Sequence, residues 1–315
     1  MKRIVVTGGA GFIASHLVAR LIDLGYAVSI IDNLSTADPR IIHPAANFIQ
    51  GSVAEPGDLQ RLPTSDIQAV FHLAAQSSGE ASFDDPQADF RTNVAGTLQI
   101  LEWCRRHAVR QFIFTSSMAA YGASSDIPLD EKTPLQPKSF YGAAKVAAET
   151  YTRLFATFGL ETTILRLFNV YGSRQNLANM KQGMASIYLS YLLKNEPIIV
   201  KGSLERFRDQ THVIDIIDAL LLCLDNPTAK GKTYNIATGE KTTVHQLLDT
   251  MFKVSGKPAN YPLTAAEGTP GDLFGCCADT TLARTELGWH CRQTLESGLQ
   301  EMHDYFAGRV DELRP

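Results

Sequence analysis

The sequence lacks the patterns that mark secreted, metal-binding or membrane-spanning proteins. Its five cysteines are scattered, odd in number and include no C-x-x-C pair, so we expect a reducing compartment and not a disulfide framework. The eight histidines show no H-E-x-x-H or comparable spacing, and we expect no metal site. No long apolar run occurs and the N-terminus passes directly into a strand pattern, which favours a cytoplasmic protein without signal peptide or membrane span.

The sequence also lacks a strong excess of positive or negative charge. The net charge of -4 gives no indication of nucleic-acid or anionic-membrane partners. The 315 residues, 44% hydrophobic and 20% charged, are typical of an ordinary globular protein with one or two domains.

The first 170 residues alternate short β-branched runs with helical stretches. The pattern predicts strands at residues 4–6, 28–32, 47–50, 69–73, 111–116 and 162–168. The clearest helical stretches are residues 11–24, 89–107 and 142–158. This alternation predicts an α/β fold with a doubly wound, Rossmann-like parallel sheet.

The pattern becomes less regular after residue 170. Helices are expected at 184–194, 213–224 and 294–306, and strands at 197–202 and 233–236, the latter returning to the main sheet. Residues 257–271 are rich in Gly, Pro and Thr. We therefore predict a dinucleotide-binding domain of residues 1–170 plus about 211–238, and a smaller, irregular α/β substrate domain of residues 171–210 and 239–315.

The most informative segment is T-G-G-A-G-F-I-A, which joins the first predicted strand to the first helix. Gly8 and Gly9 can adopt the backbone angles of a tight turn, and Gly11 lets main-chain N–H groups approach phosphate oxygens at a helix N-terminus. Ala14, in the third small-residue position, keeps the helix close to the sheet. This arrangement is typical of a dinucleotide pyrophosphate site.

Asp32 ends the second predicted strand, about 20 residues after the glycine turn. A carboxylate there can accept a hydrogen bond from a ribose 2′-hydroxyl and repels a 2′-phosphate. No arginine follows immediately, so the sequence favours NAD over NADP as the cofactor.

Tyr141 and Lys145 form Y-x-x-x-K at the start of a predicted helix, where positions i and i+4 share a face. A tyrosine that acts as a base near pH 7 needs its pKa lowered by roughly 3 units, about 4 kcal/mol, to which a nearby ammonium contributes. Ser116 and Ser117 end an apolar strand, where a hydroxyl could orient a substrate oxygen for Tyr141. His72, also at a strand end, is interpreted as a buried core histidine.

In order along the chain, H-L-A-A-Q, N-V-A-G-T, T-S-S-M-A-A-Y-G, S-F-Y-G-A-A-K, L-R-L-F-N-V-Y-G and Y-N-I-A-T-G follow the glycine turn. With that turn they resemble the extended short-chain dehydrogenase/reductase family, and most closely its NAD-dependent nucleotide-sugar epimerases of the UDP-glucose 4-epimerase type. The resemblance runs from about residue 3 to residue 306.

The resemblance implies a role for each matching residue. The implied catalytic residues are Ser117, Tyr141 and Lys145. The implied NAD contacts are Gly8, Gly11, Phe12 and Ile13 at the pyrophosphate, Asp32 and Asn33 at the adenosine ribose, Ser52 and Val53 at the adenine, Leu73, Ala74, Ala75 and Gln76 at the nicotinamide half with Asn93 behind it, and Tyr141 and Lys145. The implied substrate contacts are Ser117, Asn169, Arg208, Asp272 and Cys276.

Several positions depart from the family pattern. Ser52 stands where an Asp near the adenine is usual, and Thr269 where an Arg often precedes P-G-D, which leaves base recognition open. Met118-Ala119 replaces the Asp-Glu pair of the sugar 4,6-dehydratases, so dehydration is not expected. Cys276 stands where a small residue admits an N-acetyl group at the sugar C2; alternatively, Cys276 and Cys277 are simply buried small apolar residues.

The expected function is NAD-dependent C4 epimerisation of a UDP-hexose, which suits surface polysaccharide synthesis. One alternative is an NAD(P)H-dependent reductase of a nucleotide-linked 4-keto-6-deoxy sugar. Another is a non-catalytic dinucleotide sensor, which the intact Tyr141 and Lys145 disfavour. The resemblance also implies a homodimer through the helices at 89–107 and 142–158, on the first of which Phe90 and Trp103 are expected to be packed.

Overall fold

The structure, a computed structural model, describes residues 2–122, 128–268 and 273–309. Within these ranges, seven strands form one parallel sheet in the order β11-β6-β5-β4-β1-β2-β3. The strands are β1 Arg3–Thr7, β2 Ala27–Asp32, β3 Asn47–Gln50, β4 Ile67–His72, β5 Gln111–Ser117, β6 Glu161–Leu167 and β11 Lys232–Ile236. The predicted doubly wound sheet is confirmed, including the late strand that returns to it beside β6.

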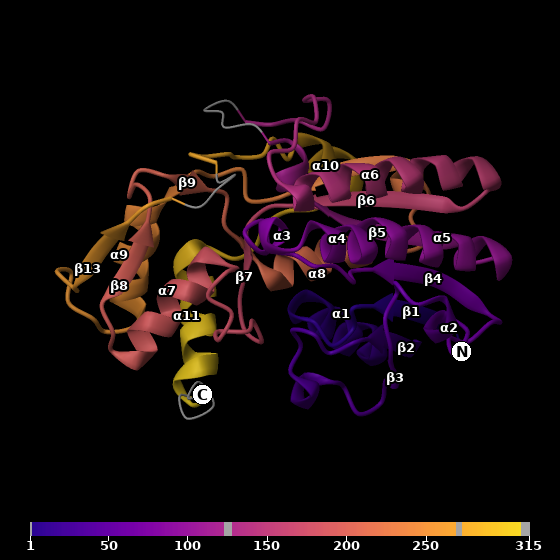
Figure 1. The fold of residues 1–315 in the computed structure, drawn as a ribbon, viewed down its shortest axis with the longest axis horizontal. Helices are drawn as coiled ribbons and strands as arrows, with labels where there is room; N and C mark the ends of the chain where they lie inside the picture. Colours follow the sequence, from indigo (N-terminus) through magenta and orange to yellow (C-terminus); the bar gives the residue numbers. More distant parts are fainter. Residues whose placement is uncertain (1, 123–127, 269–272, 310–315) are drawn as a thin grey trace.

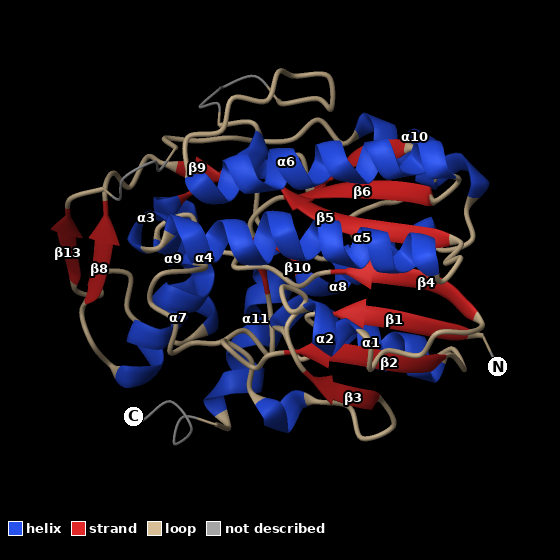
Figure 2. Ribbon diagram, turned by 45° about the vertical axis from the view of Figure 1, so that its right-hand side comes forward, coloured by secondary structure: helices blue, strands red, loops and turns tan. Residues whose placement is uncertain are grey.

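The strand order reverses between β1 and β4, which are hydrogen-bonded neighbours (Figure 2). In an open parallel sheet, the loops that leave the carboxyl ends of two such strands diverge and leave a crevice between them. Thr7 ends β1 and His72 ends β4 in matching register, so the glycine turn and the H-L-A-A-Q segment leave the sheet side by side.

Helices cover both faces of the sheet (Figure 1). One face packs against α1 Phe12–Asp23, α8 Val213–Cys223 and α10 Thr281–Leu287. The other packs against α2 Pro56–Leu59, α5 Gly96–Arg106 and α6 Phe140–Phe155. Because the inner strands are buried from two sides, strands such as β1, β4 and β5 are built mainly from apolar residues.

The predicted helix at 89–107 starts earlier than expected, is interrupted by a π-helical turn, and is preceded by one further short helix. The segment consists of α3 Ala81–Asp84, α4 Pro86–Phe90, a π-helical turn at Arg91–Ala95 and then α5. The Asp85 side chain accepts a hydrogen bond from the Ala88 N–H and Pro86 occupies the first turn, a start signal that the apolar periodicity did not reveal. A π turn adds one residue per turn and occurs often at functional sites.

A second core lies beside the sheet, on the left of Figure 1. Its helices are α7 Met184–Lys194, α9 Val244–Val254 and α11 Leu295–Ala307. Two-stranded pairings complete it: β8 Ile198–Lys201 with β13 Leu263–Ala266, β9 Phe207–Arg208 with β12 Thr242–Thr243, and β7 Val170–Tyr171 with β10 Thr211–His212. Within the described ranges, no helix is both long and apolar enough to cross a membrane.

Candidate active site

A cleft of about 1210 Å³ follows the carboxyl ends of the strands and is closed on its other side by the second core. It is lined by seventeen of the residues predicted from the sequence: Gly8, Gly11, Phe12, Ile13, Asp32, Asn33, Ser52, Val53, Leu73, Ala74, Ala75, Gln76, Ser117, Tyr141, Lys145, Asn169 and Arg208. Asn93 and Cys276 are not among its lining residues, and Asp272 lies outside the described residues.

The glycine turn is shaped by close backbone approach. Gly8 has a φ of +68°, and a Cβ there would lie 2.7 Å from the backbone N and Cα of Ala74. Gly11 is the N-cap of α1, where among the described residues no side chain caps the helix and no acid occupies its first turn. The first N–H groups of α1 can therefore serve an anion, and the turn fits a dinucleotide pyrophosphate.

Asp32 is anchored by the backbone of two loops. Its Oδ2 accepts from Ala10 N at 3.0 Å and its Oδ1 accepts from Leu34 N at 2.8 Å. Burial raises the pKa of Asp32, while these two N–H donors act in the opposite direction. Each carboxylate oxygen keeps a further lone pair, so the fixed carboxylate can still accept from ribose hydroxyls.

Ser52 shapes the loop after β3. Its N–H donates to Asp58 Oδ2 at 2.8 Å, and its Oγ accepts from Ala54 N at 3.1 Å. Arg61 in turn donates to Asp58 Oδ1 at 2.6 Å. The hydroxyl that replaces the usual carboxylate is thus engaged with the backbone of its own turn.

Tyr141 and Lys145 share the buried face of α6, with 9% and 3% of their surfaces exposed. Ser139 begins this helix by accepting from Gly142 N at 3.1 Å. Lys145 Nζ donates to the Thr115 carbonyl at 2.9 Å and lies 5.8 Å from the centre of the Tyr141 ring. Ser117, at the end of β5, hydrogen-bonds the Tyr141 side chain. These three side chains meet at the cleft.

Burial dominates the electrostatics of this trio. It raises the pKa of Tyr141 to about 12, against the lowering effect of the Ser117 hydrogen bond. It also lowers the pKa of Lys145 to about 8, although the charges of Asp89 and Glu149 act to raise it. At neutral pH the pair is therefore a phenol beside an ammonium, and the phenol becomes a base only when further positive charge approaches it.

The neighbouring Ser116 is engaged elsewhere. Its Oγ donates to Glu149 Oε1 at 2.6 Å, and Glu149 also accepts from Arg166 Nη2 at 2.8 Å. Of the two strand-end serines, Ser117 is thus the one that faces Tyr141.

Asn93 lies behind the cleft wall, in the π-helical turn. Its Oδ1 accepts from Gln76 N and its Nδ2 donates to Gln76 O, each at 2.9 Å. The same Nδ2 donates to Asp89 Oδ1 at 3.0 Å, and Gln76 Nε2 donates to that oxygen at 2.9 Å. Asp89 was not among the residues singled out from the sequence, although its i, i+4 spacing from Asn93 places the two on one helix face.

His72 is the buried core histidine that the sequence predicts. Its Nδ1 lies 2.6 Å from Thr7 Oγ1 and its Nε2 lies 3.0 Å from Thr97 Oγ1. Burial lowers its pKa to about 3, so the ring is neutral at ordinary pH. The ring ties β1 and α5 to β4 beneath the cleft.

The residues predicted to contact the substrate differ in their surroundings. Arg208 is 5% exposed, and its guanidinium donates to the carbonyls of Phe207 at 2.7 Å and Leu273 at 2.8 Å. Cys276 is fully buried in a small apolar cluster, with its Sγ 3.3 Å from Met118 Sδ. Met118 does line the cleft, so an effect of Cys276 on a ligand would be transmitted through Met118.

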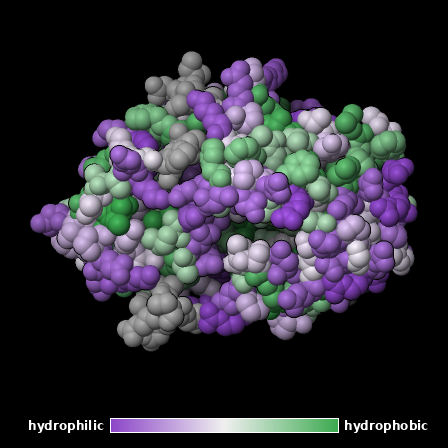
Figure 3. Space-filling view, in the orientation of Figure 1, coloured by the Kyte–Doolittle hydropathy of each residue, from purple (hydrophilic) through white to green (hydrophobic). Residues whose placement is uncertain are grey.

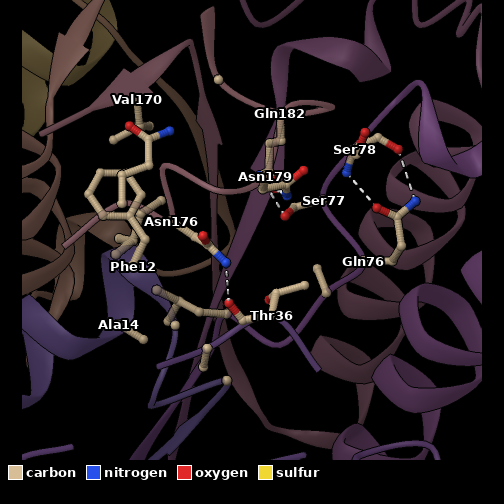
Figure 4. Close-up of a pocket in the computed structure, with 18 of the residues that line it drawn as sticks. Phe12, Ala14, Thr36, Gln76, Ser77, Ser78, Val170, Asn176, Asn179 and Gln182 are labelled. Carbon is tan, nitrogen blue, oxygen red and sulfur yellow. Dashed lines mark hydrogen bonds between the residues drawn. The ribbon is translucent and has the colours of Figure 1, made fainter. Parts of the chain in front are cut away.

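The loop after β7 crosses the cleft (Figure 4), and its contacts there were not predicted from the sequence. Asn176 Nδ2 donates to Thr36 O at 3.1 Å, and Gln182 Nε2 donates to Ser77 Oγ at 2.7 Å. Ser78 Oγ donates to Lys181 O at 2.8 Å. This crossing loop therefore bonds to the loops after β2 and β4, on both sides of the sheet's reversal point.

Comparison with known proteins shows the family of the chain. A model of the NAD dependent epimerase/dehydratase family matches residues 4–237. The chain belongs to this family. Among the family's curated proteins, a putative UDP-glucose 4-epimerase of Methanocaldococcus jannaschii is 35% identical, with 95% of this chain and 96% of that protein covered.

Solved structures related to the family give the same result. The UDP-glucose 4-epimerase of Thermotoga maritima, solved with UDP-glucose, has a TM-score of 0.93 at 35% identity and covers 98% of this chain and 99% of its own. The UDP-glucose 4-epimerase of Thermus thermophilus, solved with NAD, has a TM-score of 0.90 at 30% identity and the same coverage. The predicted family and fold class are confirmed.

Proposed function

We propose that the protein interconverts a UDP-hexose pair at C4, UDP-glucose and UDP-galactose, through a transient 4-keto sugar with NAD retained as its cofactor. The observation that carries the proposal is the meeting of Ser117, Tyr141 and Lys145 at a cleft that also contains the glycine turn and Asp32. The names of the relatives support it, since they are UDP-glucose 4-epimerases, one of them solved with NAD.

The cofactor would lie along the sheet side of the cleft. Its pyrophosphate would face Gly8, Gly11, Phe12 and Ile13, its adenosine Asp32, Asn33, Ser52 and Val53, and its nicotinamide half Leu73 to Gln76 with Asn93 behind. When bound, NAD supplies the hydride acceptor and donor for the sugar C4, together with the positive charge of its oxidised ring.

The chain's own residues move the proton. Tyr141, as phenolate, takes the proton of the 4-hydroxyl and later returns it to the keto oxygen. Ser117 holds that oxygen beside the phenol, and the Lys145 ammonium stabilises the phenolate. The two half-reactions are opposite in sense, so the net reaction has no redox change and consumes no cofactor.

The substrate would be held by the other side of the cleft. We assign the sugar diphosphate to Asn169, whose buried Oδ1 accepts no hydrogen bond within the described residues, and the nucleotide to Arg208. Asp272 remains a prediction for the same end. We also propose the domain division given above, in which residues 1–170 and about 211–238 bind NAD and the rest bind the nucleotide sugar.

The range of sugars accepted would depend on Met118. This side chain is half-buried, lines the cleft directly after Ser117, and lies against the fully buried Cys276. A flexible thioether above a small residue can be displaced more easily than an aromatic ring. We therefore propose that UDP-N-acetylhexosamines enter the pocket when the Met118 side chain changes rotamer and turns out of the cleft.

The protein would act as a homodimer through α4, α5 and α6. Large apolar side chains are exposed on or beside these helices, and the hydrophobic side chains in Figure 3 gather over α5 and α6. Phe90 is 58% exposed, Leu154 54% and Phe158 63%. Trp103 is buried as expected, but the expectation that Phe90 packs within the chain was wrong. Light scattering at several concentrations tests the dimer.

The function is tested by incubating purified protein with UDP-glucose, UDP-galactose and their N-acetyl forms, with no NAD added, and reading the products by proton NMR. Interconversion of a pair without added cofactor is the expected result. If conversion occurs only with a 4-keto sugar, and consumes NAD(P)H in proportion, the protein is a reductase and the proposal is wrong.

A further inference from the structure

A buried carboxylate outside the motifs quoted above lies on a short helix that packs against α6, the helix of the proposed catalytic pair. Asp89, in α4, is 1% exposed. Its Oδ1 accepts from two neutral amides, Gln76 Nε2 at 2.9 Å and Asn93 Nδ2 at 3.0 Å. Its Oδ2 accepts no hydrogen bond from a described residue. A buried charge of this kind is costly, which suggests that it serves the site.

The bonds to Asp89 fix a wall of the cleft. Asn93 is oriented by Asp89 and in turn grips both the N–H and the carbonyl of Gln76. Gln76 uses its side chain to bond Asp89 and both backbone groups of Ser78. Without the Asp89 oxygen, the buried Asn93 amide and the half-buried Gln76 amide would each lose a partner, and the loop after β4 would lose its support.

The charge of Asp89 also reaches the catalytic pair. Both α4 and the π-helical turn pack against α6, which carries Tyr141 and Lys145. The Asp89 charge raises the pKa of both side chains. Burial in turn raises the pKa of Asp89 itself to about 6.

Two other titratable groups approach this pair. Glu149, on α6, is engaged by the guanidinium groups of Arg153 and Arg166. His72, on β4, is neutral because burial lowers its pKa to about 3. Asp89 thus differs from both: its hydrogen-bond partners among the described residues are neutral, and the positive charge that acts on it is that of Lys145.

We propose that Asp89 is a positioning residue of the active site, which fixes the Gln76 wall through Asn93 and sets, through its charge, the pH range in which Tyr141 and Lys145 work together. The proposal rests on the proposed function, since it assigns the catalytic proton transfer to that pair. With Asp89 charged, the ammonium is favoured and the phenolate disfavoured. Without the charge, both groups lose their protons at lower pH.

The substitution Asp89→Asn separates the charge from the geometry. An amide oxygen can accept from the same two donors, and the amide nitrogen replaces an oxygen that has no described partner. We expect the bound NAD content to be unchanged and both limbs of the pH profile of kcat to move to lower pH by ~0.5–1 unit, about a three- to tenfold rate change at fixed pH on either limb.

A second readout does not depend on turnover. In NAD-loaded protein with ¹³Cζ-labelled tyrosine, the Tyr141 resonance is assigned by its loss in Tyr141→Phe. Its titration midpoint should fall by ~0.5–1 unit in Asp89→Asn. In the wild type, the same resonance should show a smaller first step near pH 6, where Asp89 titrates. This readout remains valid even if the protein proves not to be an epimerase.

The matched control is Asp85→Asn, the same substitution four residues earlier, at an exposed cap that asparagine also fills. It should leave both titrations unchanged. A uniform fall in kcat for Asp89→Asn, with unshifted limbs and an unshifted Tyr141 midpoint, would reduce Asp89 to a structural role and overturn the proposal. A wild-type resonance without the step near pH 6 would overturn it as well.

Discussion

The two walls of the cleft are built differently. On the sheet side, the groups that face the cleft are mostly backbone or are fixed by backbone: the Gly8 turn packed on Ala74, the uncapped N-terminus of α1, and Asp32 held by Ala10 and Leu34. On the other side they are side chains such as Met118 and Arg208, whose positions depend on packing between segments far apart in the sequence.

This difference matches the two ligands: the groups of a dinucleotide are always the same, whereas the sugar varies. A pyrophosphate and a ribose present the same groups in every dinucleotide, and a strand end fixes backbone donors with little freedom. A sugar is distinguished by the position of one hydroxyl or one N-acetyl group, which requires adjustable side chains. The proposed catalytic trio lies where the walls meet, with Ser117 on a strand end and Tyr141 and Lys145 on α6.

The largest effect is expected where the two walls meet. Tyr141→Phe removes the proton-transfer group and leaves both walls intact. We expect kcat to fall by ~10³-fold or more, because general acid–base catalysis contributes roughly 10²–10⁴-fold. The NAD content of the purified protein should remain at the wild-type level. An active variant would contradict the assignment of Tyr141.

On the sheet-side wall, Gly8→Ala should weaken cofactor binding. The new Cβ would lie 2.7 Å from the Ala74 backbone at a φ of +68°, and the strand ends cannot move apart without breaking the sheet. We expect ~10²-fold weaker NAD binding, measured by titration of stripped protein, since such strain costs of order 1–3 kcal/mol.

Gly25→Ala is the control for this substitution. Gly25 has a φ of +84°, but a Cβ added there would have no heavy atom within 4 Å beyond its chain neighbours. The variant should lose some stability and keep its NAD affinity. Equal loss of affinity in both variants would mean that the backbone angle, and not the close approach to Ala74, is what matters at Gly8.

Below the sheet-side wall, His72 should make stability depend on pH. Its pKa is about 3 in the folded protein and about 6.5 in the unfolded chain, so only the unfolded chain takes up a proton as pH falls below 6.5. Stability is therefore lost on acidification, by about 2 kcal/mol between pH 7 and pH 5. In urea unfolding, His72→Gln should reduce this loss; the same pH slope in both proteins would contradict the account.

On the substrate-side wall, Met118→Ala should change selectivity. We expect kcat/KM for UDP-N-acetylglucosamine to rise ~10-fold relative to UDP-glucose, since small volume changes in a pocket are worth about 1–3 kcal/mol. Cys276→Ala should change the ratio less, because Cys276 does not line the cleft. The reverse ranking would show that Cys276 is the direct determinant.

The crossing loop should give the smallest effect. Asn176→Ala removes the exposed hydrogen bond to Thr36 across the cleft, and also the bond that Asn176 Oδ1 accepts from Ala178 N within the loop. We expect NAD to dissociate a few-fold faster, since one such bond contributes about 0.5–1.5 kcal/mol. Asn179→Ala, in the same loop but bonded to Gln182 within it, is the control and should leave the rate unchanged.

The sheet and the sheet-side wall of the cleft were predictable for the same reason: both depend on regular patterns in the local sequence. Buried parallel strands are short β-branched runs, and the helices between them have regular apolar faces. The glycine turn, Asp32 and the Y-x-x-x-K pair lie at the ends of these elements, so their place in the cleft followed. The resemblance to a family then supplied the role of each of these residues.

The remaining elements depended on tertiary context. β13 is fully exposed and exists through its pairing with β8, and nothing in its Leu-Thr-Ala-Ala sequence marks a strand. The helix α9 was missed although Thr243 and Gln246 form a capping box that the sequence displays. Three features arise only when distant segments pack together: the contacts of Asn176, the burial of Cys276 and the hydrogen bonds of Asp89.

The most direct test of the central claim is the fate of the hydrogen at C4. UDP-[4-²H]glucose, incubated with the protein as purified, should give UDP-galactose that keeps the deuterium at C4, because the hydride leaves and returns within one bound sugar while Tyr141 carries only the hydroxyl proton. Loss of the deuterium to solvent would contradict the account, since it would require C4 itself to be deprotonated.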